Sequence, residues 1–211
     1  MVQAVAEATR TGTMKLKKVL LFVAIDVVVL VAGFAFYMDA FDSPPLERSK
    51  FASTAVFFST YRGPYSGIEG AWMRFQGEWE KAGLDKCDAI GIYLDPPGTP
   101  EDQLRSILAC RLDGLTAEVR NKMTAVFPTF KIPDSATVSA TFPYRNKLSF
   151  MVAPMRIYPR MQRLIETERL SPAAALETYG PGAIGPFMGF HMLIGLDRSA
   201  MQPLMDAFGG Q

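Results

Sequence analysis

The segment ALETYG, residues 175–180, places a carboxylate and an aromatic ring two positions apart, at Glu177 and Tyr179. Residues two apart in a β-strand project from the same face, so this acid and this ring would share one side of a sheet. A carboxylate among rings loses hydration, and it then holds a proton more tightly or attracts a cation. Ring faces attract the same cation. The pattern fits a site for a cationic ligand; the alternative is a Glu177 that faces solvent or pairs with an arginine.

A second concentration of rings lies in YRGPYSGIEGAWMRFQGEW, residues 61–79. Four of its residues recur at spacings of four, three and four, which places them on one helix face, as in a core stripe: Ile68, Trp72, Phe75 and Trp79. We expect core packing from this stripe, and keep Trp72 as a candidate ligand contact. Tyr61 and Tyr65 stand at the corner between a strand and this helix, where the rim of a pocket is a natural role.

Composition argues against most other chemistry. The chain has one histidine, His191, and no Ser-His-Asp, phosphate-loop or metal-ligand pattern. We expect His191 to be a core or rim residue. Of the 22 basic and 21 acidic residues, four basic and two acidic lie in the first 38, so the remainder is nearly neutral and has no footprint for nucleic acid. We predict no cofactor, no metal, no catalytic residue and no nucleic-acid partner.

Residues 19–38, VLLFVAIDVVVLVAGFAFYM, form the one long apolar run. A helix of about 20 residues spans about 30 Å, the thickness of a bilayer's hydrocarbon core, so we predict a transmembrane helix. The alternative is a cleaved signal peptide with KLKK as its basic region. Asp26 within the run is either a polar contact to a partner helix or a tolerated charge.

Charges around this run predict its orientation. Lys and Arg are denser before the run than after it, which places residues 1–18 in the cytoplasm. The rest of the chain would then lie on the exoplasmic side, in a periplasm or an organelle lumen. The alternative is an ER membrane protein whose folded domain lies in the cytosol.

The remainder of the chain divides into a linker, a duplicated domain and a tail. The linker covers residues 39–51, and residues 198–211 form the tail. Between them, residues 52–113 and 136–197 are similar halves that each predict strand, helix, strand, strand, at an offset of about 80–85 residues. The join between the halves predicts a short helix from about Thr116, a plausible N-cap.

Several stretches resemble a known family. YRGPYSGI, GIYLDPPGTPEDQLRSILACRL and ALETYG resemble the GyrI-like domain, the effector-binding module also fused to AraC- and MerR-type regulators. VSATFPYRNKLSF and the helix after it are similar to a membrane-anchored branch of that family, which includes a testis-expressed ER-phagy receptor. The resemblance covers most of residues 52–196.

This resemblance implies an α+β fold in which tandem β-α-β-β units form a pseudo-symmetric, concave antiparallel sheet with two main helices, here preceded by one transmembrane helix. It also implies a small-molecule cleft between the halves, lined by rings and often containing a Glu that meets a cationic aromatic ligand. By motif Glu177 is that acid, and Tyr93 and Tyr65 join Tyr179 as ring candidates. Some relatives are hydrolases of small electrophiles, in which Glu177 would correspond to the base.

The chain departs from the family in two respects. The 50 residues before the domain are occupied by the anchor and linker, so we expect no DNA-binding helix-turn-helix. The segment after the domain is shorter than the disordered tail that the ER-phagy receptor uses.

A pairing of Cys87 with Cys110 is a separate hypothesis. Folding the predicted hairpin about PPGTPEDQ brings the two residues near each other. A disulfide there would suit an oxidising compartment.

We therefore expect a single-pass membrane protein whose GyrI-like domain binds a small aromatic or cationic ligand without turning it over. Two alternatives remain from the sequence. One is a scaffold or accessory subunit of a membrane assembly, held partly through Asp26. The other is a small-molecule hydrolase that uses Glu177.

Overall fold

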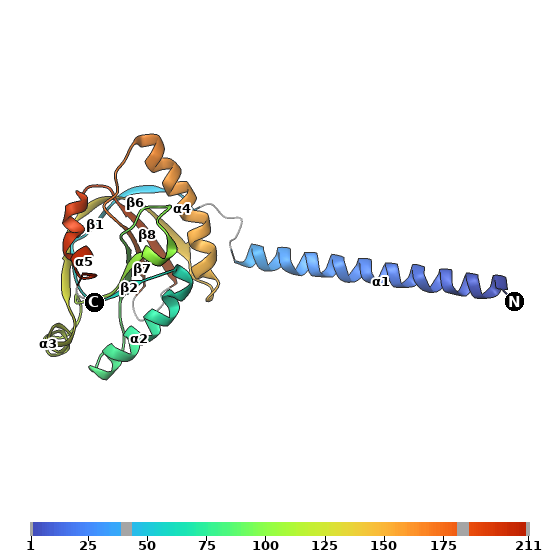
Figure 1. Ribbon diagram of the computed structural model, residues 1–211, viewed down its shortest axis with the longest axis horizontal. Coiled ribbons are helices and arrows are strands. Elements are labelled where there is room, and N and C mark those ends of the chain that lie inside the picture. The colour runs from blue at the N-terminus through green and yellow to red at the C-terminus, as the bar shows by residue number, and fades with distance from the viewer. Residues whose placement is uncertain (1, 39–43, 181–185, 210–211) are drawn as a thin grey trace. The chain divides into compact units, whose positions relative to one another are not determined.

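The computed structural model describes residues 2–38, 44–180 and 186–209 (Figure 1). The chain divides into two units, Met1–Asp42 and Ser43–Gln211. Residues 39–43 of the predicted linker and the last two residues of the predicted tail lie outside the described residues.

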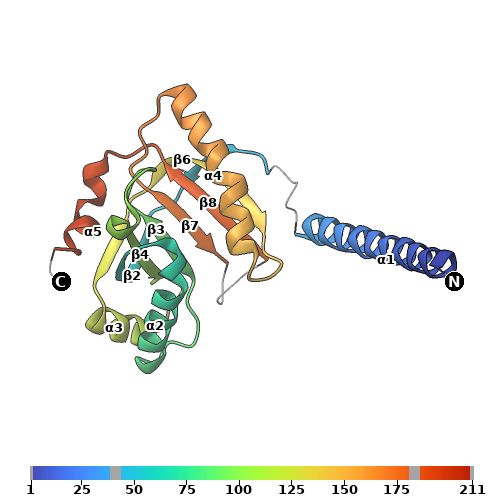
Figure 2. The same ribbon diagram turned by 45° about the vertical axis from the view of Figure 1, so that its right-hand side comes forward.

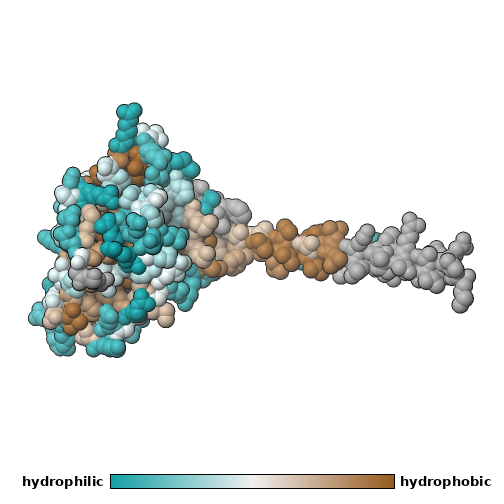
Figure 3. Space-filling view, in the orientation of Figure 1, coloured by the Kyte–Doolittle hydropathy of each residue, from teal (hydrophilic) through white to brown (hydrophobic). Residues whose placement is uncertain are grey.

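The first unit holds one helix, α1 (Val2–Tyr37). Its stretch Leu20–Tyr37 has a mean hydropathy of 2.5, has no buried part, and is long and apolar enough to cross a membrane. Figure 3 shows this stretch as a mostly brown, hydrophobic segment. A signal sequence has the same properties, so the transmembrane helix stays a prediction.

The second unit is built on one eight-stranded antiparallel sheet, in the order β1-β6-β8-β7-β3-β4-β2-β5. The first half of the chain supplies β2 (Thr54–Arg62), α2 (Ile68–Lys81), β3 (Ala89–Tyr93) and β4 (Arg105–Arg111). The second half supplies β6 (Ser135–Pro143), α4 (Ser149–Glu168), β7 (Ala175–Tyr179) and β8 (Phe187–Leu193). The predicted α+β class, with its duplicated β-α-β-β pattern, is confirmed.

The two halves meet at the centre of the sheet, where β3 pairs with β7 and Gly91 lies opposite Glu177. The segments GIY, residues 91–93, and ETY, residues 177–179, are structurally equivalent. Each begins at the Gly91–Glu177 pair and continues along its own strand in the opposite direction to the other. The local pseudo-two-fold axis therefore passes beside Glu177.

The helices α2 and α4 cover one face of the sheet (Figure 2). Every fourth residue of α4 is buried against the strands, and this spacing explains why the segment is a helix with one apolar side: Ser149, Ala153, Ile157, Met161 and Ile165. The opposite face packs Ile90, Ile92 and Leu176 into a separate core. Because the central strands are buried on both faces, β3 has the nearly continuous apolar sequence AIGIY.

Three segments depart from the sequence prediction. The predicted linker contains β1 (Glu47–Phe51), a charged edge strand paired with β6. The join contains β5 (Thr129–Ile132) after the expected helix α3 (Ala117–Val126), and Thr116 caps α3 as predicted. The predicted tail folds as η3 (Arg198–Met201) and α5 (Gln202–Asp206), because its apolar side chains pack onto the core beneath the sheet.

The phrase YLDPPGTPEDQLR has a structural explanation at the β3–β4 hairpin. Asp95 accepts hydrogen bonds from the backbone N–H of Arg105, at 2.6 Å, and from its guanidinium, at 2.5 Å. The short helix η2 (Glu101–Gln103) lies between them. This pair clamps the base of the loop and fixes the end of β3, which carries Tyr93.

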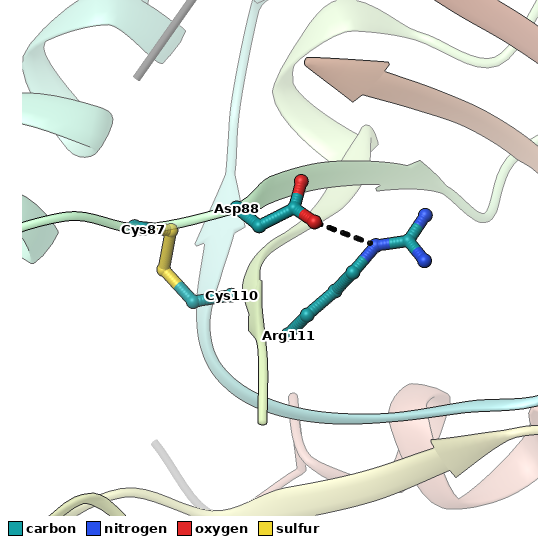
Figure 4. Close-up of a disulfide and its surroundings, with 4 residues drawn as sticks. All are labelled: Cys87, Asp88, Cys110 and Arg111. Carbon is teal, nitrogen blue, oxygen red and sulfur yellow. Dashed lines mark ion pairs between the residues drawn. A yellow bond between two sulfur atoms is a disulfide. The ribbon is translucent and has the colours of Figure 1, made fainter. Parts of the chain in front are cut away.

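The other end of the hairpin carries a disulfide between Cys87 and Cys110 (Figure 4). Their Cα atoms are 5.4 Å apart, and Arg111 forms an ion pair with Asp88 at 3.4 Å beside them. The pairing hypothesised from the sequence is confirmed.

Replacing both cysteines, as Cys87→Ala with Cys110→Ala, should lower the free energy of unfolding by about 3 kcal/mol. The expectation follows from the sequence separation of 23 residues that the disulfide closes. Urea denaturation of the full chain in detergent micelles, with and without reductant, measures the effect. Reductant should destabilise the wild type and leave the double variant unchanged; an equal response of both would contradict the assignment.

Candidate functional site

The face of the sheet beneath α2 and α4 buries a carboxylate among tyrosines. Glu177 is 5 % exposed, and three phenol hydroxyls donate to it. Tyr179 donates to Oε2 at 2.6 Å and Tyr158 to Oε1 at 2.8 Å. Tyr93 donates to Oε2 at a longer 3.2 Å. We call Glu177 and these three residues the Glu177 cluster.

Tyr93 and Tyr179 reach the same oxygen because the duplication places them at equivalent positions on β3 and β7. Gly91 makes the approach of Tyr93 feasible. A Cβ atom at this position would lie 3.2 Å from the Tyr93 hydroxyl and 3.4 Å from its ring, tighter than ordinary contact. The first half therefore has no side chain where the second half has Glu177.

Tyr158 comes from α4 and was missed by the sequence analysis. It follows Ile157 of the buried stripe, so the helix turns it toward the flank of that stripe, and its ring also packs edge-on against Phe190 at 5.6 Å. A signal existed in the duplication. The buried residues of α2 and α4 align when Trp72 is placed over Tyr158, which puts an aromatic ring at this position in both halves.

Further rings surround the Glu177 cluster. Tyr65 meets Tyr93 edge-on at 5.4 Å, and Trp72 meets Tyr179 edge-on at 6.3 Å. Phe150, at the start of α4, contacts Tyr179 at 5.6 Å. Tyr65 is 46 % exposed and Phe150 is 37 % exposed, so these two rings form the open edge of the site.

The structure thus brings together five of the six residues proposed from the sequence as ligand contacts: Glu177, Tyr179, Tyr93, Tyr65 and Trp72. The cluster is filled by its own side chains. A ligand that reaches Glu177 must therefore displace rings. Two open surface hollows, beside Cys87 and beside Asp95, are lined by none of the cluster residues.

Tyr61 has a different place from the other five. Its hydroxyl donates to the carbonyl of Pro64 at 2.8 Å, and its ring packs into the core beneath α2. A Cβ at Gly67 would lie 2.4 Å from that hydroxyl, so the glycine of YRGPYSG accommodates this contact. The motif locks the corner between β2 and α2.

His191 lies on the opposite face of the sheet from Glu177, since it pairs with Leu176 in the register of β7 and β8. It is partly buried and packs edge-on against Phe51 at 5.4 Å. Burial lowers its pKa to about 4, so the ring is neutral at physiological pH.

Electrostatics within the cluster depend on burial. Burial raises the pKa of Glu177, and the hydrogen bonds from Tyr179, Tyr158 and Tyr93 oppose that rise. Burial and the adjacent carboxylate raise the pKa values of the three tyrosines well above 10.0, so their hydroxyls stay protonated donors. Among the described residues, no Lys or Arg contributes to the pKa of Glu177, and no group of side chains could hold a metal ion. The cluster is a buried acid without a cationic partner from the described chain.

Comparison with known proteins supports the fold. No protein-family model and no curated protein matches the sequence. The structure of SAV2435 bound to tetraphenylphosphonium is similar at a TM-score of 0.50 and 14 % identity, over 71 % of this chain and 93 % of that one.

The C-terminal domain of EcmrR is similar at a TM-score of 0.52 and 12 % identity, over 71 % of this chain and 96 % of that one. EcmrR in its DNA complex aligns over 82 % of this chain and 68 % of that one, at a TM-score of 0.52 and 10 % identity. These neighbours are consistent with the GyrI-like fold that the sequence resembles, and at such identities they show the fold alone. Membership of the membrane-anchored branch stays a prediction.

The variant Glu177→Gln should remove a pH dependence of stability. Because the pKa of Glu177 is raised on folding, the folded state holds this proton to higher pH than the unfolded state. The free energy of unfolding contributed by this group therefore falls as the pH rises through that window. We expect Glu177→Gln to stabilise the domain at neutral pH, relative to the wild type, and this advantage to shrink toward mildly acidic pH.

Urea denaturation of the full chain at a series of pH values measures this difference. Glu78→Gln, the same change at an exposed position of α2, is the matched control and should show no such trend. An advantage of Glu177→Gln that grows on acidification would mean that the tyrosine hydrogen bonds outweigh burial.

Proposed function

We propose that this chain is a single-pass membrane-anchored protein whose GyrI-like domain binds a small aromatic or cationic ligand at the Glu177 cluster without turning it over. The observation that carries the proposal is the buried carboxylate held by three tyrosine hydroxyls. The structural likeness to SAV2435, which was solved with tetraphenylphosphonium, agrees with a ligand of this class.

A cation is the ligand charge that the cluster favours. Burying a carboxylate costs free energy unless an opposite charge or hydrogen bonds compensate it. The tyrosines supply hydrogen bonds, but Glu177 retains a raised pKa, so part of the cost remains in the free protein. A cation beside the carboxylate would recover that part, and the ring faces of Tyr65, Tyr93 and Trp72 would attract the same charge.

An aromatic or otherwise apolar body is favoured by the surrounding rings. Trp72 and Phe150 each pack against Tyr179. A flat apolar group could therefore replace part of the contact that either ring makes with Tyr179. Entry past Tyr65 and Phe150 requires the smallest rearrangement, because these are the most exposed rings of the site. Both oxygens of Glu177 already accept hydrogen bonds from tyrosine hydroxyls, which favours holding a charge over abstracting a proton from a ligand.

For the topology, we propose a cytoplasmic N-terminus and an exoplasmic domain. The charge distribution around Leu20–Tyr37 supports this orientation. The Cys87–Cys110 disulfide supports it independently, because disulfides persist in the periplasm and the ER lumen and are rare in the cytosol.

Tetraphenylphosphonium should bind the wild-type chain, and Glu177→Gln should weaken binding at least about tenfold, or about 1.4 kcal/mol. The loss follows because the variant removes the negative charge while keeping the shape of the side chain. Isothermal titration calorimetry of the full chain in a nonionic detergent measures both affinities.

Two further variants accompany this titration. Tyr158→Phe should weaken binding less, because it removes one donor and leaves the charge. Glu78→Gln should bind as the wild type does. Equal affinity of Glu177→Gln and the wild type would refute the site.

The topology predicts protection of the domain from added protease. In sealed vesicles whose cytoplasmic side faces outward, a C-terminal tag should survive protease until detergent opens the vesicle. Digestion of the tag in intact vesicles would place the domain in the cytosol and contradict the orientation proposed from the charges and the disulfide.

A further inference from the structure

The exposed side of α4 differs in chemistry from that of its counterpart α2. Leu148, Met151 and Met155 recur at spacings of three and four, so they form one stripe. Met151 is 64 % exposed and Met155 is 72 % exposed. When the two halves are aligned as above, Glu69 of α2 stands in the place of Met155. Single exposed apolar residues are ordinary, but a continuous stripe beside the exposed Phe150 marks a contact surface.

Basic residues flank this apolar stripe. Residues 145–169, which comprise α4 and its two ends, contain six basic and two acidic residues, whereas the equivalent residues 59–83 around α2 contain three basic and three acidic residues. Arg163 is exposed beside the stripe. Lys147 is exposed there too, and its ion pair with Glu69 of α2, at 3.5 Å, is open to solvent and therefore weak. An apolar helix face flanked by Lys and Arg is the pattern of helices that lie at the surface of a bilayer.

The chain segment that connects α1 to the domain enters the domain beside α4. Arg160 of α4 donates a hydrogen bond to the carbonyl of Pro44, the first described residue of the domain. Met155 and Met151 precede Arg160 by about 8 Å and about 14 Å along the helix axis. The chain from Tyr37 to Pro44 cannot span more than about 25 Å. A bilayer crossed by α1 therefore lies within reach of the stripe.

We propose that the stripe Leu148, Met151 and Met155 rests on the lipid bilayer, with Lys147 and Arg163 directed to phospholipid headgroups. The inference rests on the membrane anchoring proposed above. It specifies how the site is approached: Phe150 is exposed beside the stripe and contacts Tyr179, so the open edge of the Glu177 cluster lies at the lipid surface. The ligand class is then an amphiphilic cation that partitions into membranes.

The test uses the full chain in vesicles of phosphatidylcholine and phosphatidylglycerol. A nitroxide is attached through p-acetylphenylalanine, which leaves the disulfide intact, at position 155 or 151 in separate variants. Met73, an apolar residue of α2 that is 67 % exposed, carries the matched control label. Electron paramagnetic resonance then measures collisions with oxygen, which concentrates in lipid, and with a nickel chelate, which stays in water.

We expect the ratio of oxygen to nickel collisions to be several-fold higher at 155 and 151 than at 73. Adding Met151→Glu should bring the ratio at 155 down to that at 73, whereas Met73→Glu should leave it unchanged. Labels at 155 and 151 that behave like the label at 73 would overturn the inference. Protection from both reagents would also overturn it, since that result indicates a protein contact on the stripe.

Flotation of the same vesicles separates this inference from the anchoring on which it rests. A chain that floats and yet shows water-exposed labels refutes the lipid contact alone. A chain that fails to float after alkaline extraction refutes the anchor and the lipid contact together. The calorimetric titration in detergent tests the ligand site independently of both.

Discussion

The burial of one carboxylate at the centre of the sheet is the constraint on which the arrangement of this domain depends. Glu177 lies where the two halves pair, and its hydrogen-bond donors come from β3, β7 and α4. A buried acid without such donors would cost several kcal/mol. The hydrogen bonds to Glu177 therefore depend on how α4 packs against β7 and on how the two halves pair.

The duplication explains both how the site arises and why it is asymmetric. An exact repeat would place two glutamates directly opposite each other at 91 and 177, and like charges at such a cross-strand pair are destabilising. Gly91 removes the second charge and gives the Tyr93 ring the space to approach Glu177. The helices diverge in the same way, since Tyr158 donates to the acid whereas Trp72 supplies only a ring face. A symmetric fold thus carries one charge with aromatic groups from both halves.

Local pattern predicted the parts of the fold and site that depend on short spacings. The period of two in ALETYG put Glu177 and Tyr179 on one face, and the hairpin around PPGTPEDQ brought Cys87 to Cys110. The edge strand β1 was missed because ERSKF is mostly charged, and its pairing with β6 depends on a distant partner. The helix in the predicted tail was missed because Met201, Leu204 and Phe208 take their role from a core that only the folded sheet creates. Tyr158 illustrates the same limit, since no local pattern shows that it faces an acid from β7.

The closed state of the proposed site limits how a ligand could gain affinity. In the free protein the rings pack against one another and the tyrosine hydroxyls donate hydrogen bonds to the carboxylate. Binding would exchange these contacts for contacts with the ligand, so only the difference between the two sets contributes to the binding free energy. That difference would be largest for a positively charged ligand, because no positive side chain among the described residues acts on Glu177. The rings that must move, Tyr65 and Phe150, are also the least buried, so the cost of opening falls on the edge and not on the core. A membrane that concentrates amphiphilic cations beside that edge would raise occupancy without any stronger contact inside the site.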